Sequence, residues 1–259
     1  MAKYGMVIDL GRCMGCNACA EACKVENNTG QGIYWMHVFR LEMGKYPNVN
    51  WLFMPRPCMH CDNAPCVKVC PVGARFKREE DGLVLTDFDR CIGCRYCEVA
   101  CPYGVNYFNW KRPERNQYFN WAGGEGRNVF GKGEVQDYIG EEITPYRNPD
   151  HKLRYGPDKR LVAGDGHYKG VIGKCTFCVH RVEKGLLPAC VANCPVTALF
   201  FGDLSDPNSE VSRLLGQKRS FRLLEENGTQ PRVYYIGGVS PANEHKTLAI
   251  GLAAVRGRK

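Results

Sequence analysis

Cysteine is the residue that most constrains how this chain can fold. The 259-residue sequence contains 16 cysteines, and all of them fall into four groups of four. A chain of this length can form a hydrophobic core of ordinary size only if nothing else occupies its interior, and so many cysteines indicate that something else does. The first group is Cys13, Cys16, Cys19 and Cys23; the second is Cys58, Cys61, Cys66 and Cys70; the third is Cys91, Cys94, Cys97 and Cys101; and the fourth is Cys175, Cys178, Cys190 and Cys194.

The spacing within the groups indicates iron-sulfur chemistry. The first and third groups read C-x2-C-x2-C-x3-C, the second C-x2-C-x4-C-x3-C and the fourth C-x2-C-x11-C-x3-C. Bacterial ferredoxins hold 4Fe-4S clusters with such a spacing, in which three thiolates bind one cluster and the cysteine after the x3 gap binds the other cluster of a pair. Proline follows that last cysteine at Pro71, Pro102 and Pro195 and turns the chain there, whereas the first group has Lys24.

Two other uses of clustered thiols fit less well. Disulfides suit small secreted chains, whereas this chain is large and its segment Met1 to Asp9 has neither an apolar signal core nor a twin arginine. Structural zinc also uses C-x2-C pairs, but three of the four groups carry the x3-C-P ending. Apolar residues at 44% and charged residues at 24% are typical of a soluble globular protein.

Local patterns predict short secondary-structure elements around the cysteine groups. The turn pair Asp81-Gly82 lies between two short apolar runs and predicts a hairpin. Asp206 to Ser209 predicts the start of a helix that runs to about Gly216, with Pro207 at or near its first turn. Strands are predicted at Tyr4–Leu10, Ile33–Met43, Ala74–Phe76, Leu83–Thr86, Ala198–Gly202 and Pro231–Ile236.

The order of the groups along the chain predicts how they pair. The second and third groups flank the predicted hairpin, so residues 57–107 are expected to form an inner module. The first and fourth groups then pair across it, in an outer module made of residues 1–56 and 171–204. We therefore expect an α+β fold of two bacterial-ferredoxin-like modules, each holding two 4Fe-4S clusters, one nested inside the other. A long loop insertion at 108–170 and a C-terminal extension at 205–259 complete the predicted organisation.

This pairing assigns each cluster a quartet of thiol ligands, because paired groups exchange their last cysteines. The four quartets account for all 16 cysteines and for four clusters. Quartet A is Cys13, Cys16, Cys19 and Cys194; quartet B is Cys175, Cys178, Cys190 and Cys23; quartet C is Cys58, Cys61, Cys66 and Cys101; quartet D is Cys91, Cys94, Cys97 and Cys70.

Motifs along nearly the whole chain resemble a known family, the four-cluster electron-transfer subunit of molybdopterin oxidoreductases of the dimethyl sulfoxide reductase and polysulfide reductase type. In the nitrate reductase branch of that family a tryptophan replaces one ligand of the third group. Here the position is Cys94, so the resemblance implies four complete 4Fe-4S clusters. The motifs are Met6-Val7-Ile8-Asp9, Pro57-Cys58-Met59-His60-Cys61-Asp62-Asn63-Ala64-Pro65-Cys66, Asp81-Gly82-Leu83-Val84, Cys91-Ile92-Gly93-Cys94, Cys101-Pro102-Tyr103, Lys174-Cys175-Thr176-Phe177-Cys178, Glu183-Lys184-Gly185-Leu186-Leu187-Pro188-Ala189-Cys190 and Pro231-Arg232-Val233-Tyr234-Tyr235.

The resemblance also implies a function and partners. One end of the cluster chain would face a molybdenum or tungsten pterin catalytic subunit, and the other a quinone-reactive integral membrane subunit. The chain itself would carry no catalytic residue and would be peripheral on the prokaryotic cytoplasmic membrane through its partner. The cytoplasmic face is favoured, and co-export with a signalled partner would place it on the periplasmic face. A free-standing polyferredoxin, shuttling electrons between soluble enzymes, is the alternative.

The formal charge of +8 would ordinarily suggest an anionic partner such as nucleic acid. Each oxidised cluster with its four thiolates carries roughly −2, so four clusters bring the charge close to neutral, and nucleic acid is not expected as a partner. Nucleotide is not expected as a partner either, because the segment Gly126 to Gly133 fails to match a phosphate-binding loop. The lysines and arginines, Arg75 to Arg78 and Arg256 to Lys259 among them, are interpreted as counter-charge and interface residues. His60 lies between two cysteines and is expected to donate a hydrogen bond near a cluster rather than to ligate it.

Two segments are open to more than one interpretation. The 73 residues between Cys101 and Cys175 show little periodicity, and a loop of this length is either a partner-docking element or a passive extension. Within it, Gly126 to Gly133 nearly matches a phosphate-binding loop but lacks the Ser or Thr and the preceding strand. The apolar stretch Thr247 to Val255 is too short to cross a bilayer and either lies against a membrane subunit or packs in the core.

Overall fold

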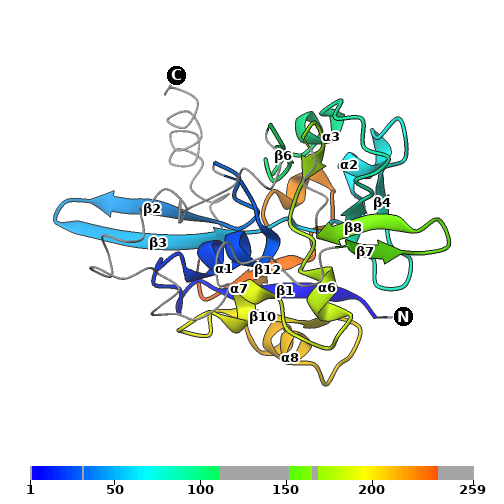
Figure 1. Cartoon of the computed structure of the whole chain (residues 1–259). Coiled ribbons are helices and arrows are strands. Elements are labelled where there is room, and N and C mark those ends of the chain that lie inside the picture. The colour runs from blue at the N-terminus through cyan, green and yellow to red at the C-terminus, as the bar shows by residue number, and fades with distance from the viewer. Residues whose placement is uncertain (1, 31, 111–151, 165–168, 239–259) are drawn as a thin grey trace, which may run out of the picture.

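The first strand, β1 (Tyr4–Asp9), lies inside a four-stranded sheet with the order β10-β1-β12-β11 (Figure 1). The computed structural model describes residues 2–30, 32–110, 152–164 and 169–238. β1 pairs antiparallel with β10 (Leu199–Asp203) and parallel with β12 (Val233–Ile236), which in turn pairs antiparallel with β11 (Ser220–Phe221). Residues from both ends of the described chain therefore share one sheet.

The two faces of this sheet bury different partners. Val7 on one face packs with Phe200, Val211 and Ile236 under helix α8 (Glu210–Gln217). Met6 and Ile8 point to the other face, into the main core. The sheet thus forms one wall of the region that holds most of the buried thiols. Eight buried cysteines belong to that core together with aliphatic and aromatic side chains: Cys19, Cys23, Cys58, Cys61, Cys66, Cys97, Cys175 and Cys190.

Each cysteine group contributes a helix. The second, third and fourth groups form single-turn helices, α2 (Pro65–Lys68), α3 (Tyr96–Val99) and α7 (Ala189–Ala192), and the fourth also forms α6 (Val179–Val182). A proline stands three residues beyond the end of each of α2, α3 and α7, directly after the last cysteine of the group, and it cannot continue a helix. The first group has Lys24 at that position, and α1 (Ala18–Asn27) continues through it. α1 packs against α7, and α2 packs against α3.

Four two-stranded hairpins or ribbons surround the helices. β2 (His37–Lys45) and β3 (Asn48–Arg56) form the longest, which extends away from the body at the left of Figure 1. β4 (Arg75–Lys77) pairs with β5 (Val84–Thr86), and β6 (Tyr107–Phe108) pairs with β9 (Ile172–Gly173). β7 (Lys152–Tyr155) pairs with β8 (Arg160–Gly164), and a short 3-10 helix, η2 (Glu225–Asn227), precedes β12.

Most of the predicted elements are confirmed, and three expectations need correction. β2 begins at His37 rather than Ile33, because residues 33–36 are not in strand conformation, and its partner β3 was not anticipated. α8 begins at Glu210 with Ser209 as its N-cap, so Pro207 precedes the helix. The described part of the long insertion is not structureless, because β8 buries Leu161 and Val162 completely and Phe88 donates its backbone N–H to the Leu161 carbonyl.

The mixture of helices and strands agrees with the predicted fold class. The segment after residue 204 supplies β11 and β12 to the sheet that β1 begins, so its described part is not separate from the segment before residue 57. The division into outer module, inner module, insertion and extension remains a prediction. The phosphate-loop-like sequence, the stretch Thr247 to Val255 and residues 256–259 lie outside the described residues.

Candidate metal centres

The thiols of quartets C and D each line one cavity. Cys58, Cys61, Cys66 and Cys101 line a cavity closed by Val84, Tyr103 and Lys174 among others. Cys70, Cys91, Cys94 and Cys97 line a second cavity, with Arg75 and Ile172 in its wall. Within the described ranges, no three His, Cys, Asp or Glu side chains converge as the ligands of one metal ion do. All 16 cysteines are free thiols.

The thiols of quartets A and B also lie together, as their mutual electrostatic influence shows. Burial raises the pKa of Cys19 to about 12, and the nearby Cys13, Cys194 and Cys16 contribute to the rise. Burial likewise raises the pKa of Cys190, with contributions from Cys178, Cys23 and Cys175. Thus Cys23, the last cysteine of the first group, lies near the cysteines of the fourth group. Cys194, the last cysteine of the fourth group, lies near the cysteines of the first.

The backbone of the cysteine loops is bent by residues in the left-handed conformation. In the first and third groups, glycine stands before the second cysteine and has a positive φ, 71° at Gly15 and 68° at Gly93. A Cβ at Gly93 would lie 2.0 Å from the Gly170 carbonyl oxygen, so only glycine fits there. Asn17 and Arg95, which follow the second cysteine, also have positive φ and start α1 and α3.

These buried thiols are poor acids unless a cation joins them. Burial raises the pKa of Cys61 and Cys175 to about 12 and that of Cys66 to about 11, and neighbouring thiols add to the rise at each. Several thiolates side by side in a dry interior repel one another, and a cationic iron core removes that penalty because it binds the thiolate form. Sets of four cysteine sulfurs around a cavity are the ligand sets that 4Fe-4S clusters use.

The quartets follow one another in a single order. α1 carries Cys19 of quartet A and Cys23 of quartet B, both buried, so these two quartets are neighbours. His60 stands between Cys58 and Cys61 of quartet C in the sequence, and its Nε2 lies 3.0 Å from the carbonyl oxygen of Cys175 in quartet B, so these two quartets are neighbours. Quartets C and D are joined through α2, which carries Cys66 and is followed by Cys70. The order is therefore A, B, C, D.

Exposure of the thiols to solvent is higher in quartets A and D, at the two ends of this order, than in quartets B and C. Cys16 of quartet A and Cys94 of quartet D are exposed, and each of these quartets has two further thiols of intermediate exposure. All four thiols of quartet B are buried, and three of quartet C are buried. Quartets A and D thus lie near the surface at the two ends, and quartets B and C lie inside.

Several buried or half-buried polar side chains contact the thiols or their loops. Asn27 donates from Nδ2 to the Cys23 carbonyl at 3.0 Å and lies 3.5 Å from the Cys23 Sγ and 3.7 Å from the Cys178 Sγ. Lys174, 1% exposed, donates from Nζ to the carbonyl of Cys175 at 2.9 Å and to that of Val84. Positive charge and N–H donors near sulfur favour the more negative, reduced state of a cluster.

His60 sits where quartets B and C meet. Its ring is completely buried and stacks on Phe177 with ring centroids 3.9 Å apart. The Val84 N–H donates to Nδ1 at 3.1 Å, so Nε2 carries the proton and donates to the Cys175 carbonyl at 3.0 Å. Burial, with the nearby charge of Lys174, holds the pKa of His60 well below its ordinary value, so the ring is neutral.

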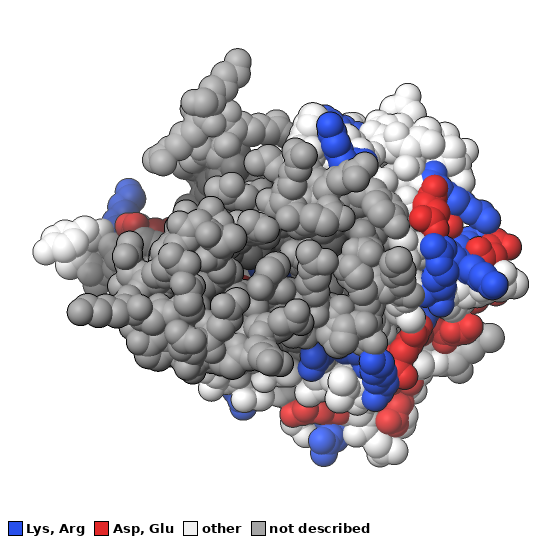
Figure 2. Space-filling view, in the orientation of Figure 1, with Lys and Arg blue, Asp and Glu red and all other residues white. Residues whose placement is uncertain are grey.

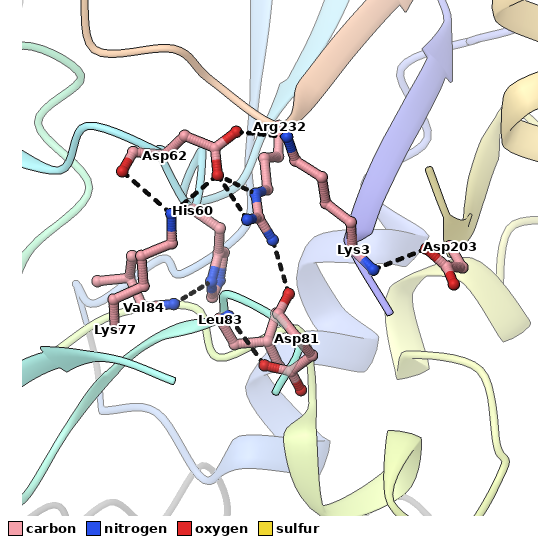
Figure 3. A network of polar contacts seen from close by, with 9 residues as sticks. All are labelled: Lys3, His60, Asp62, Lys77, Asp81, Leu83, Val84, Asp203 and Arg232. Atoms are coloured by element: carbon pink, nitrogen blue, oxygen red, sulfur yellow. Dashed lines mark hydrogen bonds and ion pairs between the residues drawn. The ribbon is translucent and has the colours of Figure 1, made fainter. Parts of the chain in front are cut away.

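A polar network ties β12 to the loops of the second cysteine group and the β4–β5 hairpin (Figure 3). Arg232 donates from Nε to the Asp62 carboxylate at 2.8 Å and from Nη1 to the Asp81 carbonyl at 2.6 Å. Lys77 and Lys3 reach the same carboxylate at 2.8 and 2.9 Å. Burial would raise the pKa of Asp62, but hydrogen bonds from these three cations outweigh it and hold the pKa well below the ordinary value.

The charged residues outside this network do not form a patch of one sign on the described surface in view. Figure 2 shows Lys and Arg side chains close to Asp and Glu side chains along the right and lower edges of that face. Exposed ion pairs such as Arg154–Asp89 at 2.7 Å and Arg90–Asp158 at 3.2 Å mix the signs further. The interpretation of Arg75 and Arg78 as interface residues is wrong, because they are only 2% and 5% exposed. Their role as counter-charge remains a prediction.

Sequence reasoning identified the cysteines and His60 but missed most of the buried polar side chains. The sequence contained one sign of Asn27 and Lys24: no proline follows Cys23, so the helix that begins in the first group can continue through both residues. Arg232 stands in one of the family motifs, but nothing in that motif indicates that it reaches Asp62.

Two family models match this chain, and both are described as a 4Fe-4S dicluster domain. One matches residues 49–117 and 162–204, and the other matches residues 12–74. Together with the thiol-lined cavities, these matches define the class of protein: the chain is an iron-sulfur protein with ferredoxin-type dicluster domains that bind 4Fe-4S clusters.

Relatives along almost the full length narrow the class to one family. The arsenate respiratory reductase iron-sulfur subunit of Shewanella sp. strain ANA-3 is 44% identical over 239 residues, 90% of this chain and 96% of that protein. A protein of Halobacterium salinarum named as a dimethyl sulfoxide reductase iron-sulfur subunit is 40% identical, covering 95% and 84%. The menaquinone reductase iron-sulfur cluster-binding subunit of Nitratidesulfovibrio vulgaris is 36% identical, covering 90% and 88%. The chain belongs to the family of iron-sulfur electron-transfer subunits of molybdopterin oxidoreductases, as its motifs suggested.

Proposed function

We propose that this chain relays single electrons through four 4Fe-4S clusters, one in each quartet, between a molybdenum or tungsten catalytic subunit and a quinone-reactive membrane subunit. The observation that carries the proposal is the order of the quartets. Thiol sets that follow one another from a partly exposed end, through a buried interior, to a second partly exposed end suit a conductor with two contact points.

When bound, each cluster supplies a centre that takes up and releases one electron. The chain's own residues hold the clusters at fixed spacing, exclude water from them and tune their reduction potentials. The thiols fix the spacing of the centres, and the buried side chains around quartets B and C exclude water. Lys174 and Asn27 place positive charge or N–H donors beside the thiols, which tunes the energy at which an electron enters.

The relatives support partners at both ends. Relatives named as iron-sulfur subunits of arsenate and dimethyl sulfoxide reductases support a catalytic partner, and a relative named as a menaquinone reductase subunit supports a quinone-linked one. We infer peripheral attachment to the prokaryotic cytoplasmic membrane through the second partner, with the cytoplasmic face favoured. Among the described residues, none of the helices has the length and apolar character that a membrane span requires.

The ligand exchange between groups is tested by a Cys194→Ser variant. If Cys194 completes quartet A, the cluster bound by Cys13, Cys16 and Cys19 loses one thiolate, and its electron paramagnetic resonance (EPR) signal changes. A Cys13→Ser variant serves as the matched control and should alter the same signal. A change confined to a different signal from that altered by Cys13→Ser would overturn the nested pairing.

The complex itself is tested by isolation of the chain from its source membranes under mild detergent. The proposal predicts that it co-purifies with a large molybdenum- or tungsten-containing subunit and with a membrane subunit. Recovery only as a lone, cluster-loaded chain of 29.1 kDa would instead support a free polyferredoxin.

A further inference from the structure

Arg75, the first residue of β4, is a buried cation in direct contact with quartet D. Its side chain is 2% exposed. Nη2 donates to the Cys97 Sγ at 3.4 Å and to the Asn106 Oδ1 at 2.9 Å. Its backbone N–H donates to the Cys70 Sγ at 3.3 Å. Arg75 therefore contacts two of the four thiols of this quartet.

Two N–H-bearing atoms of the same guanidinium, Nε and Nη1, are buried and have no hydrogen-bond partner among the described residues. A buried donor without a partner destabilises a fold, and it does so more strongly when it is charged. No carboxylate of the described chain forms an ion pair with Arg75 within 4 Å. A fully buried arginine in this state needs an acceptor of negative charge that the described residues do not supply.

The cavity beside Arg75 indicates where that acceptor is. Arg75 lines the cavity whose other lining residues include all four thiols of quartet D. A 4Fe-4S cluster with four thiolates carries a net negative charge, and the charge becomes more negative by one when an electron enters. Arginine remains positively charged at every pH that the protein meets, so the attraction is permanent.

We propose that the guanidinium of Arg75 donates its unpaired N–H groups to the sulfur atoms of the cluster in quartet D and raises the reduction potential of that cluster. This inference rests on the proposed function, because it requires a cluster in quartet D. One electron enters the cluster and no bond is made or broken, so the arginine acts only through charge and hydrogen bonding. The charge of Arg75 also acts on Cys66 and Cys58 of quartet C, but Arg75 forms no hydrogen bond with either thiol, so the potential of quartet C rises less.

The experiment is an EPR-monitored redox titration of the assembled complex. The quartet D signal is identified by its change in a Cys94→Ser variant, and the quartet C signal by its change in Cys61→Ser. Arg75→Gln removes the charge while keeping an amide donor, and Arg75→Lys keeps the charge. Arg90→Gln is the matched control, because it removes the same charge next to Cys91 from a side chain that is 44% exposed and screened by solvent.

Arg75→Gln should lower the potential of quartet D. At the wild-type midpoint the ratio of reduced to oxidised cluster should fall at least about tenfold, equivalent to 59 mV for a one-electron centre. Arg75→Lys should retain most of the wild-type potential, and Arg90→Gln should shift it much less than Arg75→Gln. The shift at quartet C should be smaller, and quartets A and B should not respond.

Equal shifts in Arg75→Gln and Arg90→Gln, or no shift in either, would overturn the inference. If Arg75→Gln loses the cluster, a cluster retained at near wild-type potential in Arg75→Lys supports the role of the charge. Loss of the cluster in both variants would contradict it, because the residue would then be needed for packing alone. Iron analysis and the EPR spectrum of the wild type come first: absence of 4Fe-4S clusters there would defeat the proposed function, whereas intact clusters without an Arg75 effect would defeat only this inference.

Discussion

At the scale of single residues, Asn27 shows how one amide can act on a buried centre. Its Nδ2 contacts the Cys23 and Cys178 sulfurs, which belong to quartet B although they are 155 residues apart in sequence. We predict that Asn27→Leu, of similar size, lowers the reduction potential of that cluster by about 40 mV, equivalent to about 1 kcal/mol for one electron. The loss arises because an N–H donor stabilises sulfur more strongly when the cluster is reduced.

Asn193 provides the control for that prediction. It also donates from Nδ2 to the carbonyl four residues earlier, at 2.9 Å, and that bond involves no thiol. Asn193→Leu should therefore leave the quartet B potential unchanged in an EPR-monitored titration. An equal shift in the two variants would mean that the change comes from general destabilisation of the helices and not from the N–H···S contact.

At the scale of elements, the length of α1 depends on Lys24. A proline here, as after the other three groups, would remove a helical N–H and clash with the preceding turn, which costs about 3 kcal/mol or more. It would also remove the Nζ donors to the carbonyls of Gly30 and Ile33, both at 3.0 Å. We predict that Lys24→Pro increases the hydrogen-exchange rate of the amides of residues 25–27 about 100-fold.

Lys24→Met separates the two effects, because it keeps the helical backbone and loses the contacts of Nζ, the two hydrogen bonds and the cation–π contact with Tyr34 among them. Exchange in α1 should then stay close to wild type, while the loop around Gly30 and Ile33 exchanges faster. Unchanged exchange in Lys24→Pro would show that the helix does not need a non-proline residue at this position.

The elements that sequence could predict are those whose cause is local. β1, β10 and β12 are apolar runs, and the β4–β5 hairpin contains the Asp81-Gly82 pair, so each carries its own signal. β3 was missed because residues 48–56 mix exposed and buried positions without clear alternation and contain Pro55. The membership of β12 in the sheet of β1 was also unreadable, since pairing partners separated by more than 220 residues leave no local pattern.

The residues of the candidate centres also separate into those with a local sequence pattern and those without one. Cysteine spacing is a local pattern, and the four quartets were predicted from it and from the order of the groups. The thiols of each predicted quartet lie near one another in the structure, and their role as the ligands of one cluster stays a prediction. Arg75 has no such signal, because a run of basic residues ordinarily lies on the surface. Its burial depends on the tertiary position of β4 between quartets C and D, which only the folded structure reveals.

At the scale of the whole molecule, Arg232 links the sheet to the loop of the second cysteine group. The side chain is 6% exposed, so its loss would leave Asp62 with only Lys3 and Lys77 and the Asp81 carbonyl without this donor. We predict that Arg232→Met destabilises the protein by about 3 kcal/mol. Faster loss of the visible absorbance of the clusters on heating the complex is the measurement.

Arg222→Met is the matched control, because Arg222 forms an ion pair with Glu225 on a more exposed surface away from the thiols. Surface pairs contribute about 0–1 kcal/mol, so this variant should lose its clusters at nearly the wild-type rate. Equal rates for the Arg232 and Arg222 variants would show that the polar network around Arg232 does not hold β12 to the loop of the second cysteine group.

The most direct measurement is the metal and sulfide content of the anaerobically isolated complex, expressed per copy of this chain after subtraction of the partner subunits' own clusters. Complete occupancy of quartets A to D predicts about sixteen irons and about sixteen acid-labile sulfides. Zinc bound to the cysteines, or far less iron on an intact chain, would contradict the account.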